Sequence, residues 1–280
     1  MELCYRIIDL LLPFEWTAHI FMKNALIAVL LVTPVFGLLG TMVVSNRMAF
    51  FSDAIGHSAL TGIALGVIMG IARPMWAMLL FALIFSLVIV IVKNSNKTST
   101  DTIIGVFSST AVALGIVILS RGGGFNKYSS YLIGDLLSIA PSDIILLLAV
   151  FAMIVVFWFI LFNRIMLVSI NRSFACSRGI NAQLVELVFT VFVALVVTIS
   201  IQWVGILIIN SLLVLPAAGA RNLSKNIRRY HFLSVLIALV SGITGLILSY
   251  YWGTATGATI ILVAAAFFAL TFFVSLAVNE

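Results

Sequence analysis

Two side chains in the stretch 45–70 are the best suited to chemistry: the carboxylate of Asp53 and the imidazole of His57. The stretch is predominantly apolar and predicts a membrane-spanning helix. Residues four apart on a helix share one face, here with about 6 Å between them along the axis. An ionised side chain inside a bilayer costs about 2.5 to 3.5 kcal/mol on insertion scales. Such a pair therefore needs a partner, a wet cavity or a function.

A carboxylate and a neutral imidazole on one face are ligands that divalent transition metals accept. The alternatives are structural, because Asp53 could cap the start of a helix and His57 could form a hydrogen bond between helices. Two further acidic residues are secondary candidates. Asp135 is either a ligand or gate at the mouth of a metal path or the cap of a short helix. Glu186 is either a second ligand or gate, or a solvated residue at a helix end.

The composition, with 63% hydrophobic and 9% charged residues, excludes a soluble domain. Apolar runs repeat along the whole chain and predict an all-α, polytopic bundle of transmembrane helices in one domain, 1–280. An outer-membrane barrel would instead alternate polar and apolar residues. The net charge of +6 lies mainly in the predicted loops, so it reports topology and not nucleic-acid binding. The two cysteines, Cys4 and Cys176, lie far apart and give neither a disulfide framework nor a structural zinc site.

The apolar runs predict about nine spans. They are 20–43, 49–70, 74–92, 102–119, 142–162, 183–202, 203–220, 232–250 and 257–277. One side carries about twice as many basic residues and is predicted to be cytoplasmic, which places the N-terminus outside and the C-terminus inside. Three segments are not predicted to span: an interfacial helix at 1–16, a re-entrant or interfacial helix at 127–141, and a cytoplasmic loop at 164–183.

The sequence lacks the motifs of an enzyme that works in or at the membrane. It contains no G-x-x-x-x-G-K-[ST], so the chain does not bind ATP through a P-loop, and no H-E-x-x-H of a metalloprotease. We therefore expect a transport subunit without catalytic residues or a permanently bound cofactor.

Five segments together resemble the permease subunit of the ABC importers for zinc, manganese and iron. They are RMAFFSDAIGHSALTGIALG (47–66), DTIIGVFSSTAVALGIVIL (101–119), YLIGDLLSIAPSDI (131–144), VGILIINSLLVLPAAGARNL (204–223) and GLILSYYWGTATGATIILVAA (245–265). The resemblance covers most of the chain, and as a set the motifs are specific. Three positions depart from the family pattern: Ser52 replaces a glycine, Thr61 a proline and Asn171 an aspartate.

The resemblance implies that Asp53 and His57 form the metal site of the permease, and that 171–179 is the coupling helix on the ATPase. The residues implied for this coupling are Asn171, Arg172, Ala175 and Gly179. It also implies a cytoplasmic ATPase that hydrolyses the ATP, an extracytoplasmic metal-binding protein, and two copies of the chain in the bilayer of a bacterial inner membrane. An aspartate and not an asparagine at position 135 is similar to the zinc-uptake branch of the family. This similarity favours Zn²⁺ over Mn²⁺ or Fe²⁺ as the transported ion. The alternative is an ion-coupled carrier or channel that uses Asp53 and His57 as a proton relay.

Overall fold

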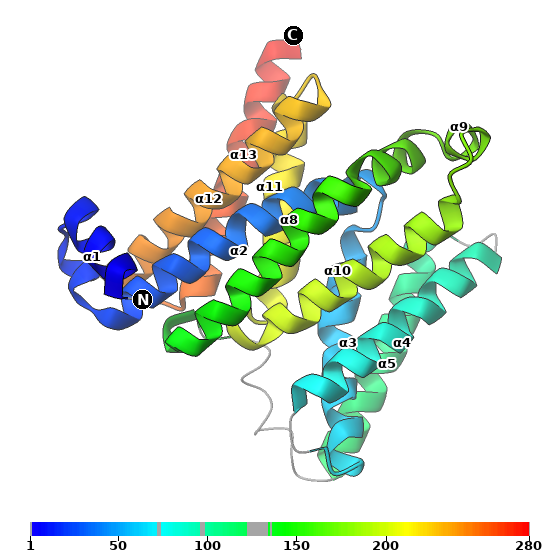
Figure 1. The fold of residues 1–280 in the computed structure, drawn as a ribbon, viewed down its shortest axis with the longest axis horizontal. Coiled ribbons are helices and arrows are strands. Elements are labelled where there is room, and N and C mark those ends of the chain that lie inside the picture. The colour runs from blue at the N-terminus through cyan, green and yellow to red at the C-terminus, as the bar shows by residue number, and fades with distance from the viewer. Residues whose placement is uncertain (1, 72–73, 96–98, 122–133, 135, 280) are drawn as a thin grey trace. The chain divides into compact units, whose positions relative to one another are not determined.

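The computed structural model describes residues 2–71, 74–95, 99–121, 134 and 136–279, and within these ranges the regular structure is entirely helical (Figure 1). The candidate residue Asp135 therefore lies outside the described residues. So does most of the predicted re-entrant or interfacial helix at 127–141. The helices of the first half are α1 (Glu2–Leu11), η1 (Glu15–Ala18), α2 (Ile20–Ser45), α3 (Ala49–Ile68), α4 (Pro74–Ser95) and α5 (Thr100–Arg121). Those of the second half are η2 (Leu136–Ser138), α8 (Pro141–Ile170), α9 (Arg172–Ser177), α10 (Ala182–Val204), α11 (Ile206–Leu223), α12 (Ile227–Trp252) and α13 (Thr256–Asn279).

Eight helices among the described residues are long and apolar enough to cross a membrane: α2, α3, α4, α5, α8, α10, α12 and α13. Each matches a predicted span, so the all-α polytopic bundle is confirmed. The ninth predicted span, 203–220, corresponds to α11, which at 18 residues is shorter than each of the other eight helices. Among the described residues eight helices thus match predicted spans by length and composition, and α11 occupies the position of the ninth.

The chain divides into two compact units, which we describe separately. Unit 1 consists of Met1–Thr41, Asp135–Val155 and Ser211–Glu280, and unit 2 consists of Met42–Gly134 and Val156–Asn210. The helices α2, α8 and α11 have residues in both. The single domain predicted from the sequence stays a prediction.

Unit 2 is organised around α3, which packs against α4, α5 and α10 (Figure 1). Small residues allow these close approaches. A Cβ atom on Gly62 would lie 2.9 Å from Cα of Met78 in α4, and one on Gly115 of α5 would lie 2.7 Å from Oγ1 of Thr61. Thr61 Oγ1 also donates a hydrogen bond to the carbonyl of Ala111 in α5. The three helices consequently hold α3 on several sides.

In unit 1, α12 packs along both α13 and the first part of α2. Ser234 of α12 donates to the carbonyl of Gly37 at 2.6 Å. At the opposite end of the same pair, the ring of His19, which precedes α2, lies 6.0 Å from the ring of Tyr250. The helices α2 and α12 are therefore antiparallel.

Two predicted boundaries differ from the structure. The loop expected from Arg164 begins only at Asn171, because the apolar residues 165–168 and Ile170 let α8 continue without a helix breaker. The turn expected at 202–203 lies instead at Gly205, whose φ of 84° is a conformation that glycine reaches without strain. A Cβ atom on Gly134 would lie 2.3 Å from the backbone nitrogen of Gly205, so the chain at Gly134 packs directly onto this turn.

Candidate functional site

Asp53 and His57 occupy the second and third turns of α3 and face the same way. The distance between Asp53 Oδ1 and His57 Nε2 is 3.4 Å, and the two side chains are 37% and 30% exposed. The interpretation of Asp53 as a helix cap is wrong, because α3 begins at Ala49 and its N-cap position is Met48. Asp53 therefore lies within the body of α3, where the backbone N–H groups bond to helical carbonyls and do not require a capping carboxylate.

The pair forms a short open stripe, one turn long, in the otherwise buried middle of α3. From Phe51 to Gly66 every residue of α3 is buried except Asp53, His57 and Leu65. Close packing accounts for the other faces, because Gly62 and Gly66 face α4 and Thr61 faces α5. Two functional groups that can bind a cation are thus presented along a stripe whose flanks are closed.

The helix α11 supports this stripe from its edge. Ser52, one residue before the aspartate, donates from Oγ to Oδ1 of Asn210 at 2.7 Å. One turn later, a Cβ atom on Gly56 would lie 2.8 Å from Cγ2 of Ile206. Ser52, which departs from the family pattern, therefore contributes a bond between helices beside the pair. Asn210 was not identified from the sequence, since a neutral amide 158 positions away gives no local signal.

No third histidine, cysteine, aspartate or glutamate joins Asp53 and His57 within the ranges that the structure describes. The two donors are fewer than the four of a closed tetrahedral site. Further ligands would have to come from water, from other kinds of donor or from a partner. Such an open site is the type that releases an ion readily.

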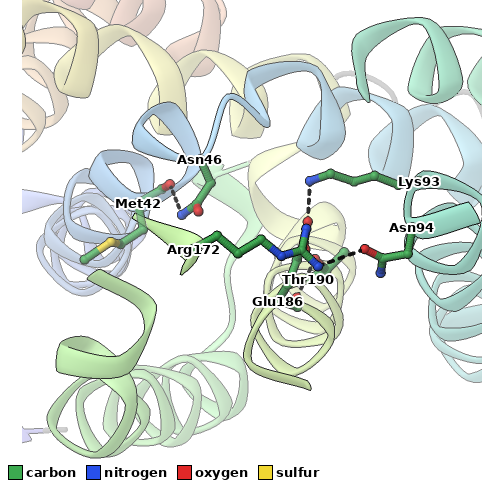
Figure 2. A network of polar contacts seen from close by, with 7 residues as sticks. All are labelled: Met42, Asn46, Lys93, Asn94, Arg172, Glu186 and Thr190. Atoms are coloured by element: carbon green, nitrogen blue, oxygen red, sulfur yellow. Dashed lines mark hydrogen bonds and ion pairs between the residues drawn. The ribbon is translucent and has the colours of Figure 1, made fainter. Parts of the chain in front are cut away.

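Glu186, the second acidic candidate in the described ranges, lies near the start of α10 and is ion-paired (Figure 2). Lys93 Nζ donates to its Oε1, and Arg172 Nη1 lies 3.9 Å from its Oε2. Two cations beside one carboxylate repel a third, so this arrangement favours a structural role over metal binding. In the sequence, Lys93 served only as one of the basic residues that indicate the orientation of the chain, and its ion pair with Glu186 was not predicted.

The predicted coupling segment forms the short helix α9, and its residues have different surroundings. The side chain of Asn171 accepts a hydrogen bond from the backbone N–H of Phe174 at 3.0 Å and caps the helix, as an aspartate would. Ala175 is fully buried, whereas Phe174 is 46% exposed. Gly179 has φ +76°, and a Cβ atom added there would meet nothing within 4 Å, so this glycine serves the turn after the helix. Arg172 reaches back from α9 to Glu186.

Comparison with known proteins gives consistent matches over nearly the whole chain. The model of the ABC 3 transport family matches residues 18–275. The high-affinity zinc uptake system membrane protein ZnuB of Haemophilus influenzae is 31% identical over 240 residues, which cover 84% of this chain and 90% of that protein. The manganese import system permease protein ScaB of Streptococcus gordonii is 28% identical over 255 residues, 91% of each chain.

The fold also has a match among solved structures. PsaBC from Streptococcus pneumoniae, determined in complex with Fab, aligns with a TM-score of 0.78 and 27% identity. The alignment covers 97% of this chain and 95% of that chain. The likeness thus extends over nearly the whole chain and is not confined to a motif.

Proposed function

Because the chain belongs to the ABC 3 transport family, as the permease subunit of a bacterial importer for zinc or manganese, we propose that it carries Zn²⁺ past Asp53 and His57. The observation that supports this most directly is the open stripe of α3, on which the two side chains lie together. Membership of this family speaks against the alternative of an ion-coupled carrier or channel.

The preference for zinc rests on the chemistry of the donors. A neutral imidazole suits zinc, and first-row metals bind a given nitrogen and oxygen site more tightly toward the end of the series, which favours Zn²⁺ over Mn²⁺ and Fe²⁺. The relatives include zinc and manganese permeases at similar identity, so likeness alone does not separate the two ions. The ion is the cargo of the protein and not a resident cofactor.

The partners follow from the architecture of an importer of this kind. We propose that an ATPase binds at α9, that an extracytoplasmic binding protein delivers the metal on the other side, and that two copies of the permease assemble. The orientation proposed is N-terminus outside and C-terminus in the cytoplasm. This fits the antiparallel pair in unit 1, since the end of α2 that follows His19 would lie outside, and the start of α12 with Arg228 and Arg229 would lie inside.

The test is uptake of zinc and of manganese by cells that contain the complete importer, with single substitutions in the permease. Asp53→Asn and His57→Ala should each abolish uptake while the permease still co-purifies with its ATPase, because each removes one of two protein ligands. Leu65→Ala is the control, since Leu65 is the other residue between Phe51 and Gly66 of α3 that is not buried, and its side chain offers no ligand. Wild-type uptake rates in both pair variants would show that the ion does not use this pair. Manganese uptake well above zinc uptake would overturn the choice of ion alone.

A further inference from the structure

The carboxylate of Glu186 joins three elements of unit 2 (Figure 2). Lys93 at the end of α4 donates to one of its oxygens, and Arg172, the first residue of α9, approaches the other. Arg172 also donates from Nη2 to Oδ1 of Asn94 at 3.3 Å. One acidic side chain of α10 therefore connects the coupling helix to α4.

Burial makes the Glu186–Lys93 pair of this network matter more than a surface ion pair. The side chain of Glu186 is 13% exposed and that of Lys93 is 21% exposed, whereas Arg172 is 49% exposed. Fully exposed pairs contribute about 0 to 1 kcal/mol, but removing one member of a buried pair leaves an uncompensated charge. Glu186 and Lys93 thus form the buried part of the network, and the more exposed Arg172 links α9 to it.

The network borders a cavity of about 270 Å³. Its lining includes Lys93, Arg172 and Glu186 on one side and the turn 45–48 between α2 and α3 on another. In this turn Asn46 Nδ2 donates to the carbonyl of Met42 at 2.8 Å (Figure 2). The same turn leads into α3, five residues before Asp53. Arg172 of α9 thus lines the same cavity as the turn that leads into the helix of Asp53 and His57.

We propose that Glu186 is a positioning residue, which fixes α9 relative to α4 and α10 through Arg172. A movement of the coupling helix α9 would then also move α4 and α10, the helices that pack on α3. The contacts α10·α4 and α10·α3 supply the continuation, since α10 packs against both. The inference rests on the proposed function for its role in transport, whereas the positioning of α9 itself does not depend on it.

The positioning is tested first without transport, on the full-length permease alone. A nitroxide spin label on the exposed Cys176 of α9, in a Cys4→Ser background, reports the mobility of the coupling helix. Glu186→Gln and Arg172→Gln should each raise that mobility, and the double variant should match either single variant, because both break the same link. Unchanged mobility in both variants, or effects that simply add, would overturn the proposal. Arg172→Gln keeps this test usable if Glu186→Gln fails to fold, because Arg172 is half exposed.

The second measurement is the number of zinc ions imported per ATP hydrolysed by the complete importer in proteoliposomes. Glu186→Gln should lower this ratio about fivefold or more, the lower end of typical couplings between sites. Arg228→Gln, an exposed cation at the start of α12, should leave it unchanged. An unchanged ratio for Glu186→Gln beside an active wild type would overturn only the role in coupling. Absence of both zinc and manganese import by the wild type would instead overturn the proposed function.

Discussion

Two helical glycines with opposite surroundings allow the packing to be tested at the scale of single residues. A Cβ atom on Gly40 of α2 would lie 1.9 Å from the backbone oxygen of Leu213, whereas one on Gly105 of α5 would meet nothing within 4 Å. Alanine is favoured over glycine in a helix by about 0.5 to 1 kcal/mol. At Gly40 that gain is outweighed, since backbone atoms cannot move aside as a flexible side chain can.

Gly40→Ala should therefore lower the thermal midpoint of the purified permease, with overpacking costs of about 1 to 3 kcal/mol. Gly105→Ala should leave the midpoint unchanged or raise it slightly. The measurement is thermal unfolding in one detergent for both variants and the wild type. Equal midpoints for the two variants would contradict the close contact between Gly40 of α2 and the backbone of Leu213 in α11.

The sequence was informative about residues where the relevant geometry is local. Asp53 and His57 lie on one face because a helix repeats every 3.6 residues, and that follows from spacing alone. The partners of Glu186 and of Ser52 could not be predicted in this way. Lys93 and Asn210 are 93 and 158 positions from them, and only the packing of α4, α10 and α11 brings them together.

At the scale of elements, α9 shows why a short motif does not reveal which side chains face a partner. The resemblance implied Ala175 and Gly179 among the residues that couple the permease to the ATPase. In the structure Ala175 is buried against its own chain, and Gly179 shapes the following turn. The exposed residue with a large apolar side chain is Phe174, whose ring lies 5.2 Å from the guanidinium carbon of Arg178.

Phe174→Ala should weaken the association of the permease with its ATPase by about 1 kcal/mol or more, because aromatic side chains at the centre of an interface often dominate binding. Ser173→Ala is the matched control, since Ser173 is an exposed neighbour on the same helix. Co-purification of the ATPase at increasing salt and detergent compares the two variants. Equal retention of the ATPase would show that α9 does not dock through Phe174.

Helix positions were predicted well because long apolar runs leave few alternatives in a membrane protein. Boundaries were less accurate where the apolar pattern and the helix end do not coincide. The helix α8 continues beyond Arg164 to Ile170, and the side chain of the following residue, Asn171, caps the next helix, α9. Such ends depend on caps and on packing, which a hydropathy pattern does not contain.

At the scale of the whole molecule, the native cysteines allow the proposed orientation to be tested without introducing new cysteines. Cys4 and Cys176 are the two cysteines of the chain, and both are exposed and free. The proposed topology places Cys4 of α1 outside and Cys176 of α9 in the cytoplasm. A maleimide that does not cross membranes should therefore label intact spheroplasts at Cys4 alone.

Two variants assign the labelling to each cysteine. Cys176→Ser should keep the signal in intact spheroplasts, and Cys4→Ser should lose it until the membrane is opened and the ATPase is stripped away. Strong labelling of the Cys4→Ser variant in intact spheroplasts would invert the orientation, and with it the assignment of α9 to the cytoplasmic side.

The open stripe of α3 also sets a condition on the hydration of an ion that would use the pair. One turn after His57 lies Thr61, which is buried and donates a hydrogen bond to the carbonyl of Ala111 in α5. The open part of this face of α3 therefore spans only the turn from Asp53 to His57, about 6 Å along the axis. An ion that uses the pair would find donor atoms of α3 only within that turn, and it would arrive there with most of its hydration shell.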